Sequence, residues 1–238
     1  TGKPATTEPV ECPKNINWDL LIGPAPMRPY QPCYFQGRWR GFWDFGSGGM
    51  GDMACHWIDL PFWALGLSYP KSVEASAPKP ADPDYTPSDL TVRYEFDYNG
   101  RTLPLTWYDG EANNDLFAQN QCPEDRATLF IGSEGALWST YWEHALVPAG
   151  KFAEKEVPAP SIPTSLGHHE EWFDAIRNDH STTCNFDYSG RLAETVLLGL
   201  VSYRCGKKLL YNADTMSAPN APEADKFLRQ PMRDGWEI

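Results

Sequence analysis

The dipeptide Asn99-Gly100 constrains the fold more than any other feature of this sequence, because it separates two segments in which apolar and polar residues alternate. Residues 90–98 and 102–109 have the period of two that is typical of β-strands. Asn and Gly readily adopt the positive φ angles of a type I′ turn, which suits two antiparallel strands. The sequence therefore predicts a β-hairpin here.

Two more segments predict strands of the same kind. Residues 72–77 alternate, and residues 127–140 predict a second hairpin that turns at Ser133-Glu134-Gly135. Residues 147–165 are rich in proline and predict a loop. Strands do not alternate with helices along the chain, as they would in a doubly wound parallel sheet. We therefore expect an α+β fold with a mostly antiparallel sheet.

Three segments predict helices around these strands. The first runs over residues 51–65 and ends before Gly66. The second covers residues 168–179, with Ser165 as a candidate N-cap, and the third covers residues 188–206. The tail from residue 222 predicts a short helix.

Charge and hydropathy exclude several classes of partner. The 238 residues include 32 acidic and 20 basic side chains, giving a net charge of −12, so neither nucleic acid nor an anionic membrane surface is an expected partner. No apolar run is long enough to span a membrane. The six cysteines are scattered without a C-x-x-C pair, which predicts free thiols. We expect one domain, residues 1–238, and the sequence does not indicate its compartment.

The chemistry of the chain is concentrated in residues 46–66, where a glycine-rich turn opens the first predicted helix. Spacings of four and three place Asp52, His56 and Asp59 on one helical face. A carboxylate one turn from an imidazole can orient it as a general base. The alternative is that Asp52 only favours the helix N-terminus and that His56 is a half-buried structural histidine.

The glycines of this stretch spell G-x-G-x-x-G at Gly46, Gly48 and Gly51. The dinucleotide-binding fingerprint needs an apolar strand before it and an acidic residue about 20 positions later. Here GRWRGFWDF precedes the glycines, and Lys71 occupies the acidic position. We reject that interpretation and expect these glycines to let backbone approach a bound ligand.

Residues 29–45 contain seven aromatic side chains among two arginines and an aspartate, with too many turn formers for a helix. They predict an ordered loop. In one interpretation the loop forms a stacking surface for a ligand beside the Asp52/His56 helix. In the other, the aromatics fill the core and the arginines pair with Asp44 and its neighbours.

Several segments together resemble one family, and they occur in the same order as in that family. The similarity is to the C-terminal domain of the Gfo/Idh/MocA oxidoreductases, named for glucose-fructose oxidoreductase and inositol dehydrogenase, and most of all to a bacterial subgroup of predicted dehydrogenases. The matching segments are NWDLLIGPAP, RWRGFWDFGSGGMGDMACHWIDLPFWALG, FIGSEGALWS, NFDYSGRLAETVLLGLVSYRCGKKL and PEADKFLRQPMRDGWEI. The resemblance implies an open sheet with helices packed on one face, as in C-terminal domains of the glucose-fructose oxidoreductase and dihydrodipicolinate reductase type.

In this family an N-terminal Rossmann domain binds NAD or NADP and supplies the lysine of a Glu-Lys-Pro motif. The C-terminal domain contributes the substrate pocket and a D-x-x-x-H pair, which matches Asp52 and His56. The resemblance thus makes His56 the acid/base and Asp52 the residue that orients it. Neither the Rossmann domain nor Glu-Lys-Pro occurs in these residues, so we expect this chain alone to bind no cofactor and to be inactive.

The resemblance also implies a carbohydrate or polyol substrate and a homo-oligomer that assembles through the sheet. We assign six further residues to substrate binding, with Asp59 also a candidate support for its helix. These residues are Arg38, Trp39, Arg40, Trp43, Asp59 and His168.

Three alternatives remain open at this stage. An NAD-assisted glycosidase of the same architecture would use the same His56. A cofactor-free carbohydrate-binding module would keep the fold without the chemistry. A metal site on Asp52, His56 and Asp59 is the third, but one imidazole and two carboxylates on one helix rarely complete a coordination shell, so we assign no metal.

Overall fold

The computed structural model of the chain describes residues 10–35, 37–110 and 115–237. The chain forms two compact units, one of residues 1–114 and 193–238 and the other of residues 115–192. No described helix is long and apolar enough to cross a lipid bilayer. Each unit is described by itself.

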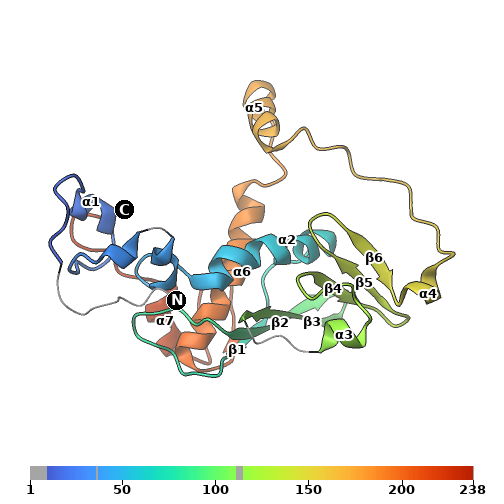
Figure 1. Ribbon diagram of the computed structural model, residues 1–238, viewed down its shortest axis with the longest axis horizontal. Coiled ribbons are helices and arrows are strands. Elements are labelled where there is room, and N and C mark those ends of the chain that lie inside the picture. The colour runs from blue at the N-terminus through green and yellow to red at the C-terminus, as the bar shows by residue number, and fades with distance from the viewer. Residues whose placement is uncertain (1–9, 36, 111–114, 238) are drawn as a thin grey trace. The chain divides into compact units, whose positions relative to one another are not determined.

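The first unit is built on a four-stranded antiparallel sheet (Figure 1). The order of the strands is β3-β2-β1-β7, and every neighbouring pair is antiparallel. The bounds of the strands are Ser72–Ser76 for β1, Leu90–Tyr98 for β2, Arg101–Asp109 for β3 and Leu209–Leu210 for β7. The strand β7 was not predicted, because a segment of two residues is too short to show a period.

The central hairpin is confirmed in its register and in its turn. All nine residues of β2 pair with β3, from Leu90 with Asp109 to Tyr98 with Arg101. Asn99 and Gly100 both have positive φ, 49° and 74°, as a type I′ turn requires.

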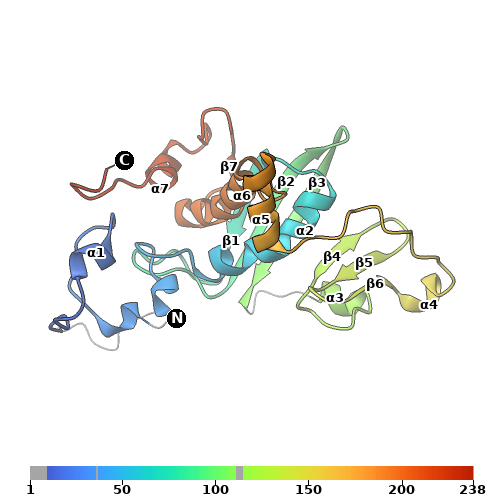
Figure 2. The ribbon, with the colours of Figure 1, turned by 90° about the horizontal axis from the view of Figure 1, so that it is seen from above.

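Two helical segments cover one face of this sheet (Figures 1 and 2). The first is the π-helical turn η3 (Met50–Ala54) continued by α2 (Cys55–Ala64), and the second is the end of α6 (Phe186–Cys205). At Gly199 the backbone of α6 lies directly on β2, and the Tyr94 hydroxyl donates to the Val196 carbonyl at 3.3 Å. The α+β class and the single helical layer are therefore confirmed for this unit.

The strand residues that the sequence singled out as apolar all face these helices. Val92, Tyr94 and Phe96 are at most 1% exposed, and the register places Trp107, Leu105 and Leu103 opposite them on the same face. Their neighbours, which face the other way, are mostly polar. The apolar face of these two strands is therefore covered by the helices of the same unit.

Hydrogen bonds and ion pairs order the other face of the sheet. The Ser72 hydroxyl donates to Glu95 at 2.5 Å and the Lys208 ammonium pairs with the same carboxylate at 2.9 Å. These two donors lower the pKa of Glu95 to about 2. Lys71 pairs with Asp97 and donates to Thr102. Any assembly through this face would be polar.

Glycines end both covering helices, as the sequence predicted. Gly66 has a φ of 59° and Gly206 a φ of 63°. After α2, the Leu67 N–H reaches back to the Phe62 carbonyl at 2.8 Å, which completes a Schellman motif. Pro61 lies inside α2 without ending it.

The remainder of the first unit is loops and short helices. The aromatic-rich segment 29–45 is an ordered loop with two single turns, as expected. The bounds are Trp18–Ile22 for α1, Pro32–Tyr34 for η1, Arg38–Gly41 for η2, Pro222–Ala224 for η5 and Asp225–Leu228 for α7.

The second unit contains a three-stranded antiparallel sheet of order β4-β5-β6. The bounds are Thr128–Ile131, Ala136–Ser139 and His144–Val147 for β4 to β6, with Leu116–Gln119 for α3, Ala149–Phe152 for α4 and His168–Asn178 for α5. Trp138 and Val147 are buried between the strands. The predicted hairpin is confirmed, whereas β6 and α4 were missed. The Ser165 hydroxyl accepts from the Gly167 N–H and does not cap α5, so that prediction is wrong.

Gly199 gives a direct test of the contact between α6 and the sheet. A Cβ at this position would lie 2.5 Å from Met50 Cε and 2.9 Å from Val92 Cγ1, so Gly199→Ala forces α6 away from β2. We expect a loss of about 1–3 kcal/mol in the free energy of unfolding, measured by urea denaturation.

Gly190→Ala is the matched control, because it makes the same change in the same helix where nothing lies within 4 Å of the added carbon. Alanine is the better helix former, so this variant should gain up to about 1 kcal/mol. Equal effects of the two substitutions would contradict the close contact.

Candidate functional site

The helix formed by η3 and α2 has a buried side and an exposed side. Met50, Ala54 and Ile58 face the core and are at most 3% exposed. Asp52 and His56 lie on the opposite, exposed side. Asp52 and His56 therefore share one face, as the spacing predicted. On this face both side chains are accessible to solvent and to ligands.

Asp52 is bound to an arginine and not to His56. Its Oδ1 lies 3.1 Å from Nε of Arg40, which comes from the single turn η2, and both side chains are 45% exposed. Within the described residues, the structure has no hydrogen bond or ion pair to His56. The predicted contact between Asp52 and His56 is therefore not made in this structure.

Most aromatics of residues 29–45 fill a local core. Tyr34 packs edge-on against Phe42 at 4.8 Å and stacks near Trp18 at 5.8 Å between ring centroids. The Arg28 guanidinium pairs with Asp44 at 2.9 Å and with Asp84 at 3.2 Å. For these residues the structure favours the core interpretation of the loop.

Trp39 and Trp43 differ in what surrounds them. Trp43 is half-buried, with its indole N–H donating to the Asp82 carbonyl at 2.9 Å and the Arg204 guanidinium 4.7 Å from its ring. It thus holds the loop over residues 77–89 in place. Trp39 is 39% exposed and has the Arg40 guanidinium 4.7 Å from its ring centroid.

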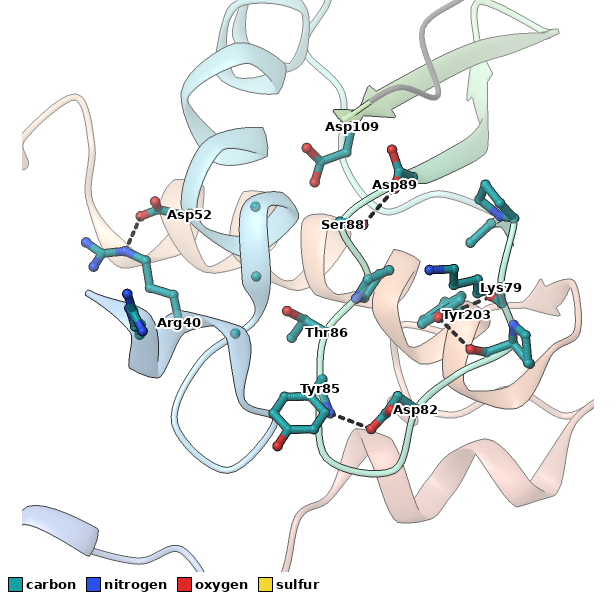
Figure 3. Close-up of a pocket in the computed structure, with 18 of the residues that line it drawn as sticks. Arg40, Asp52, Lys79, Asp82, Tyr85, Thr86, Ser88, Asp89, Asp109 and Tyr203 are labelled. Atoms are coloured by element: carbon teal, nitrogen blue, oxygen red, sulfur yellow. Dashed lines mark hydrogen bonds and ion pairs between the residues drawn. The ribbon is translucent and has the colours of Figure 1, made fainter. Parts of the chain in front are cut away.

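A cavity of about 650 Å³ lies between η2, the start of the η3 helix and the loop over residues 77–89 (Figure 3). It lies wholly within the first unit. Of the residues predicted for the site, Arg38, Arg40 and Asp52 line it, whereas Trp39, Trp43, His56 and Asp59 do not.

His168 belongs to the second unit. It lies exposed at the first position of α5, where its ring packs against His169 with 4.3 Å between centroids.

The glycines before the helix bring it close to other parts of the chain. A Cβ at Gly48, whose φ is 65°, would lie 2.6 Å from the Thr86 hydroxyl oxygen. A Cβ at Gly49 would lie 2.7 Å from the Asp109 carboxylate. We had expected the close approach to be to a ligand, but here the neighbours are Thr86 and Asp109 on the walls of the cavity.

One end of the cavity is acidic, and no pattern in the sequence predicted it. Figure 3 shows Asp89 and Asp109 together there, away from Arg40 and Asp52. Burial, followed by the charge of Asp89, raises the pKa of Asp109, although the Gly110 N–H opposes the shift. The available signal was a strand ending in Asp-Gly and a preceding loop with three aspartates.

The opposite part of the loop is fixed to α6. The Tyr203 hydroxyl lies 3.3 Å from the Lys79 carbonyl and 3.1 Å from the Pro80 carbonyl, and it donates toward both. Tyr203 and the side chains of Tyr85, Thr86 and Ser88 line the cavity. Hydroxyl groups and ring faces are therefore present beside the charges.

The described residues do not fit a dinucleotide. Both sheets are antiparallel, so the chain has no described βαβ unit to hold a pyrophosphate at a helix N-terminus. The G-x-G-x-x-G run follows a single helical turn and a loop instead of a strand. A nicotinamide cofactor therefore has no site that we can derive from these residues.

A metal ion also lacks a site in the part of the chain that the structure describes. No group of three or more His, Cys, Asp or Glu side chains there is arranged to hold one. Asp52, His56 and Asp59 thus do not form the metal cluster considered as an alternative.

Comparisons with known proteins agree with this fold. Residues 1–238 match the model of the Gfo/Idh/MocA oxidoreductase family, C-terminal alpha/beta domain. No curated protein matches the chain.

Two solved structures are similar to the chain. The Bacillus subtilis protein yvaA is 16% identical over 75% of this chain and 54% of its own, with a TM-score of 0.39. An oxidoreductase from Agrobacterium radiobacter, solved with NAD+, L-tartaric acid and magnesium, is 13% identical over 66% of this chain and 47% of its own, with a TM-score of 0.35. The chain spans about half the length of these two proteins.

The raised pKa of Asp109 predicts that ionisation of this carboxyl lowers the free energy of unfolding. An acid whose pKa is higher in the folded state than in the unfolded state favours folding below the unfolded value, and this contribution is lost as pH rises through the folded value. Asp109→Asn should therefore raise the free energy of unfolding at pH 7 and leave it nearly unchanged at pH values below the usual range of Asp.

Urea denaturation at several pH values measures this difference. Asp234→Asn, at an exposed aspartate that does not line the cavity, is the control for the change in net charge. A loss of stability at pH 7 in Asp109→Asn would mean that the charged carboxylate is stabilising.

Proposed function

Because the chain belongs to the Gfo/Idh/MocA oxidoreductase family as its C-terminal alpha/beta domain, we propose that it binds the substrate of an NAD(P)-dependent oxidoreductase acting on the C–OH group of a sugar or polyol. The observation that carries this proposal is the cavity in the first unit, which combines charged groups, hydroxyls and ring faces beside the Asp52/His56 helix.

The lining of the cavity suits a polyhydroxylated molecule. Each sugar hydroxyl both donates and accepts hydrogen bonds, so its site needs groups of both kinds. Arg38 and Lys79 are donors, whereas Asp89 and Asp109 are acceptors when ionised. The rings of Tyr85 and Tyr203 offer faces for the C–H groups of a sugar.

His56 is the proposed acid/base. Its imidazole is exposed on the same helix face as Asp52, which lines the cavity, so it can exchange a proton with a substrate hydroxyl that extends to that face. Asp52 lies one turn earlier and is proposed to orient the ring. Asp59, Trp39 and His168 remain predicted substrate contacts.

The same helix face supports the proposal that another protein domain covers it. Met53 and Trp63 are 38% and 52% exposed there, on either side of His56 in the sequence. Large apolar side chains at the surface are typical of sites that bind other protein surfaces. A nucleotide-binding domain that carries NAD or NADP is the partner we propose, and assembly of copies through the polar sheet face remains a further proposal.

The chain alone should not bind NADH. A dinucleotide needs a strand, a glycine-rich turn and a helix N-terminus, and the described residues have no such unit. Titration of NADH against the fluorescence of the ten tryptophans is the measurement. Saturable binding in the micromolar range would overturn the proposal that another domain carries the cofactor.

His56→Asn should lower turnover of the intact enzyme by roughly 10² to 10⁴, the range for a positioned general base. Its melting temperature should not change, because the side chain is exposed. The measurement is NAD(P)+ reduction with a panel of sugars and polyols.

His144→Asn is the control, an exposed histidine on β6 in the second unit, and it should turn over normally. Full turnover in His56→Asn would assign the proton transfer to another residue. Absence of oxidation of every sugar and polyol would contradict the proposed substrate class.

A further inference from the structure

We infer that the ligand of this cavity is an acidic sugar, and that its carboxylate binds Arg40 and thereby releases Asp52 to His56. The inference rests on the proposed function, and it adds a substrate class and a step by which the substrate assembles its own acid/base pair.

Arg40 is placed to bind a carboxylate. Its guanidinium lies 4.7 Å from the Trp39 ring centroid, which restricts its orientation, and only its Nε contacts Asp52. A guanidinium has five N–H donors, so its two terminal nitrogens keep donors for a second carboxylate. Gly37 has no side chain to cover them, since a Cβ there would lie 3.3 Å from one of these nitrogens.

Two arginines and two carboxylates lie at different parts of the cavity. Arg38 and Arg40 both come from η2 on one side, whereas Asp89 and Asp109 lie together at another end (Figure 3). A molecule with a carboxylate at one end and hydroxyls at the other matches this separation. A neutral sugar would leave Arg38, on the η2 side, without a complementary charge.

The two other cations of the cavity have no carboxylate partner among the described residues. Arg38 and Lys79 line the cavity without an ion pair. The carboxylates, by contrast, have local donors, since Asp82 accepts from the backbone N–H groups of Asp84 and Tyr85. On the η2 side, the unpaired Arg38 beside the free donors of Arg40 therefore favours an anionic group.

The contact between Arg40 and Asp52 is weak enough to be exchanged. Both side chains are 45% exposed, and ion pairs at such positions contribute little to stability. Asp52 lies one helical turn before His56, within reach of its ring once Arg40 is drawn to another carboxylate. Arg40 thus competes with His56 for Asp52, and the ligand decides the competition.

The first test measures binding to the 238-residue chain by titration calorimetry. The probes are D-glucuronate with D-glucose and D-galacturonate with D-galactose, so each pair differs in its carboxylate. The wild type should bind one acidic sugar about tenfold more tightly than its neutral partner, the order expected for one charge-assisted contact. Arg40→Gln should lose this preference.

Arg229→Gln is the matched control, because Arg229 also forms an exposed ion pair, with Asp225 at 3.6 Å, but does not line the cavity. It should keep the preference. Equal affinity for acidic and neutral sugars would overturn the inference while leaving a sugar site in place, and a preference that persists in Arg40→Gln would overturn the role of Arg40. No binding of any probe would overturn both the inference and the proposed sugar site.

The second test follows the imidazole by ¹⁵N NMR. The acidic sugar should shift the ring nitrogen signals of His56 as Asp52 turns to it, and its neutral partner should not. Asp52→Asn should bind the acidic sugar but show a smaller shift. His144 and His180 are internal controls, and unchanged His56 signals at saturation would overturn the release of Asp52.

Discussion

The close contact of α6 with β2 supports every other part of the first unit. It depends on the missing side chain of Gly199, which lets the helix backbone approach Val92 and Tyr94. The Tyr94 hydroxyl, buried at 0% exposure, is satisfied there by the Val196 carbonyl. Without this contact a buried phenol would lose its partner, which costs far more than the bond itself contributes. The η3 helix meets the same point through Met50, so both covering helices are positioned by one glycine.

The cavity is a consequence of this scaffold, because the segments that line it are attached to the scaffold on three sides. Tyr203 at the end of α6 holds the loop over residues 77–89 from one side, and Trp43 holds it from another. Gly48 and Gly49 then bring the helix start against Thr86 and Asp109. The side chains of Arg40 and Asp52, in contrast, are exposed, and among the described residues Arg40 contacts Asp52 and Trp39. A rigid wall therefore faces a pair of side chains that a ligand can rearrange, which suits the proposed role in substrate binding.

Local patterns predicted the elements well, and they failed where elements are short or partners are distant. The hairpin at Asn99-Gly100 and the helix ends at Gly66 and Gly206 were correct, since each depends on a few neighbouring residues. The strands β6 and β7 were missed because four and two residues do not establish a period. The prediction of Ser165 as an N-cap was wrong, because its hydroxyl accepts from the backbone N–H of Gly167, which precedes the helix.

The sequence by itself determined the fold class, the hairpin register, the helix ends and the shared face of Asp52 and His56, because all of these follow from periodicity and from residues close together in the chain. Only the tertiary structure decided which apolar strand face is covered, which aromatics of residues 29–45 are buried, and that Arg40 is the partner of Asp52. Only it showed that Asp89, Asp109 and Tyr203 share a cavity with Arg38. A carboxylate can accept hydrogen bonds from any of several donors within its reach. Which donor it meets depends on how distant segments of the chain pack, and no local sequence pattern records that.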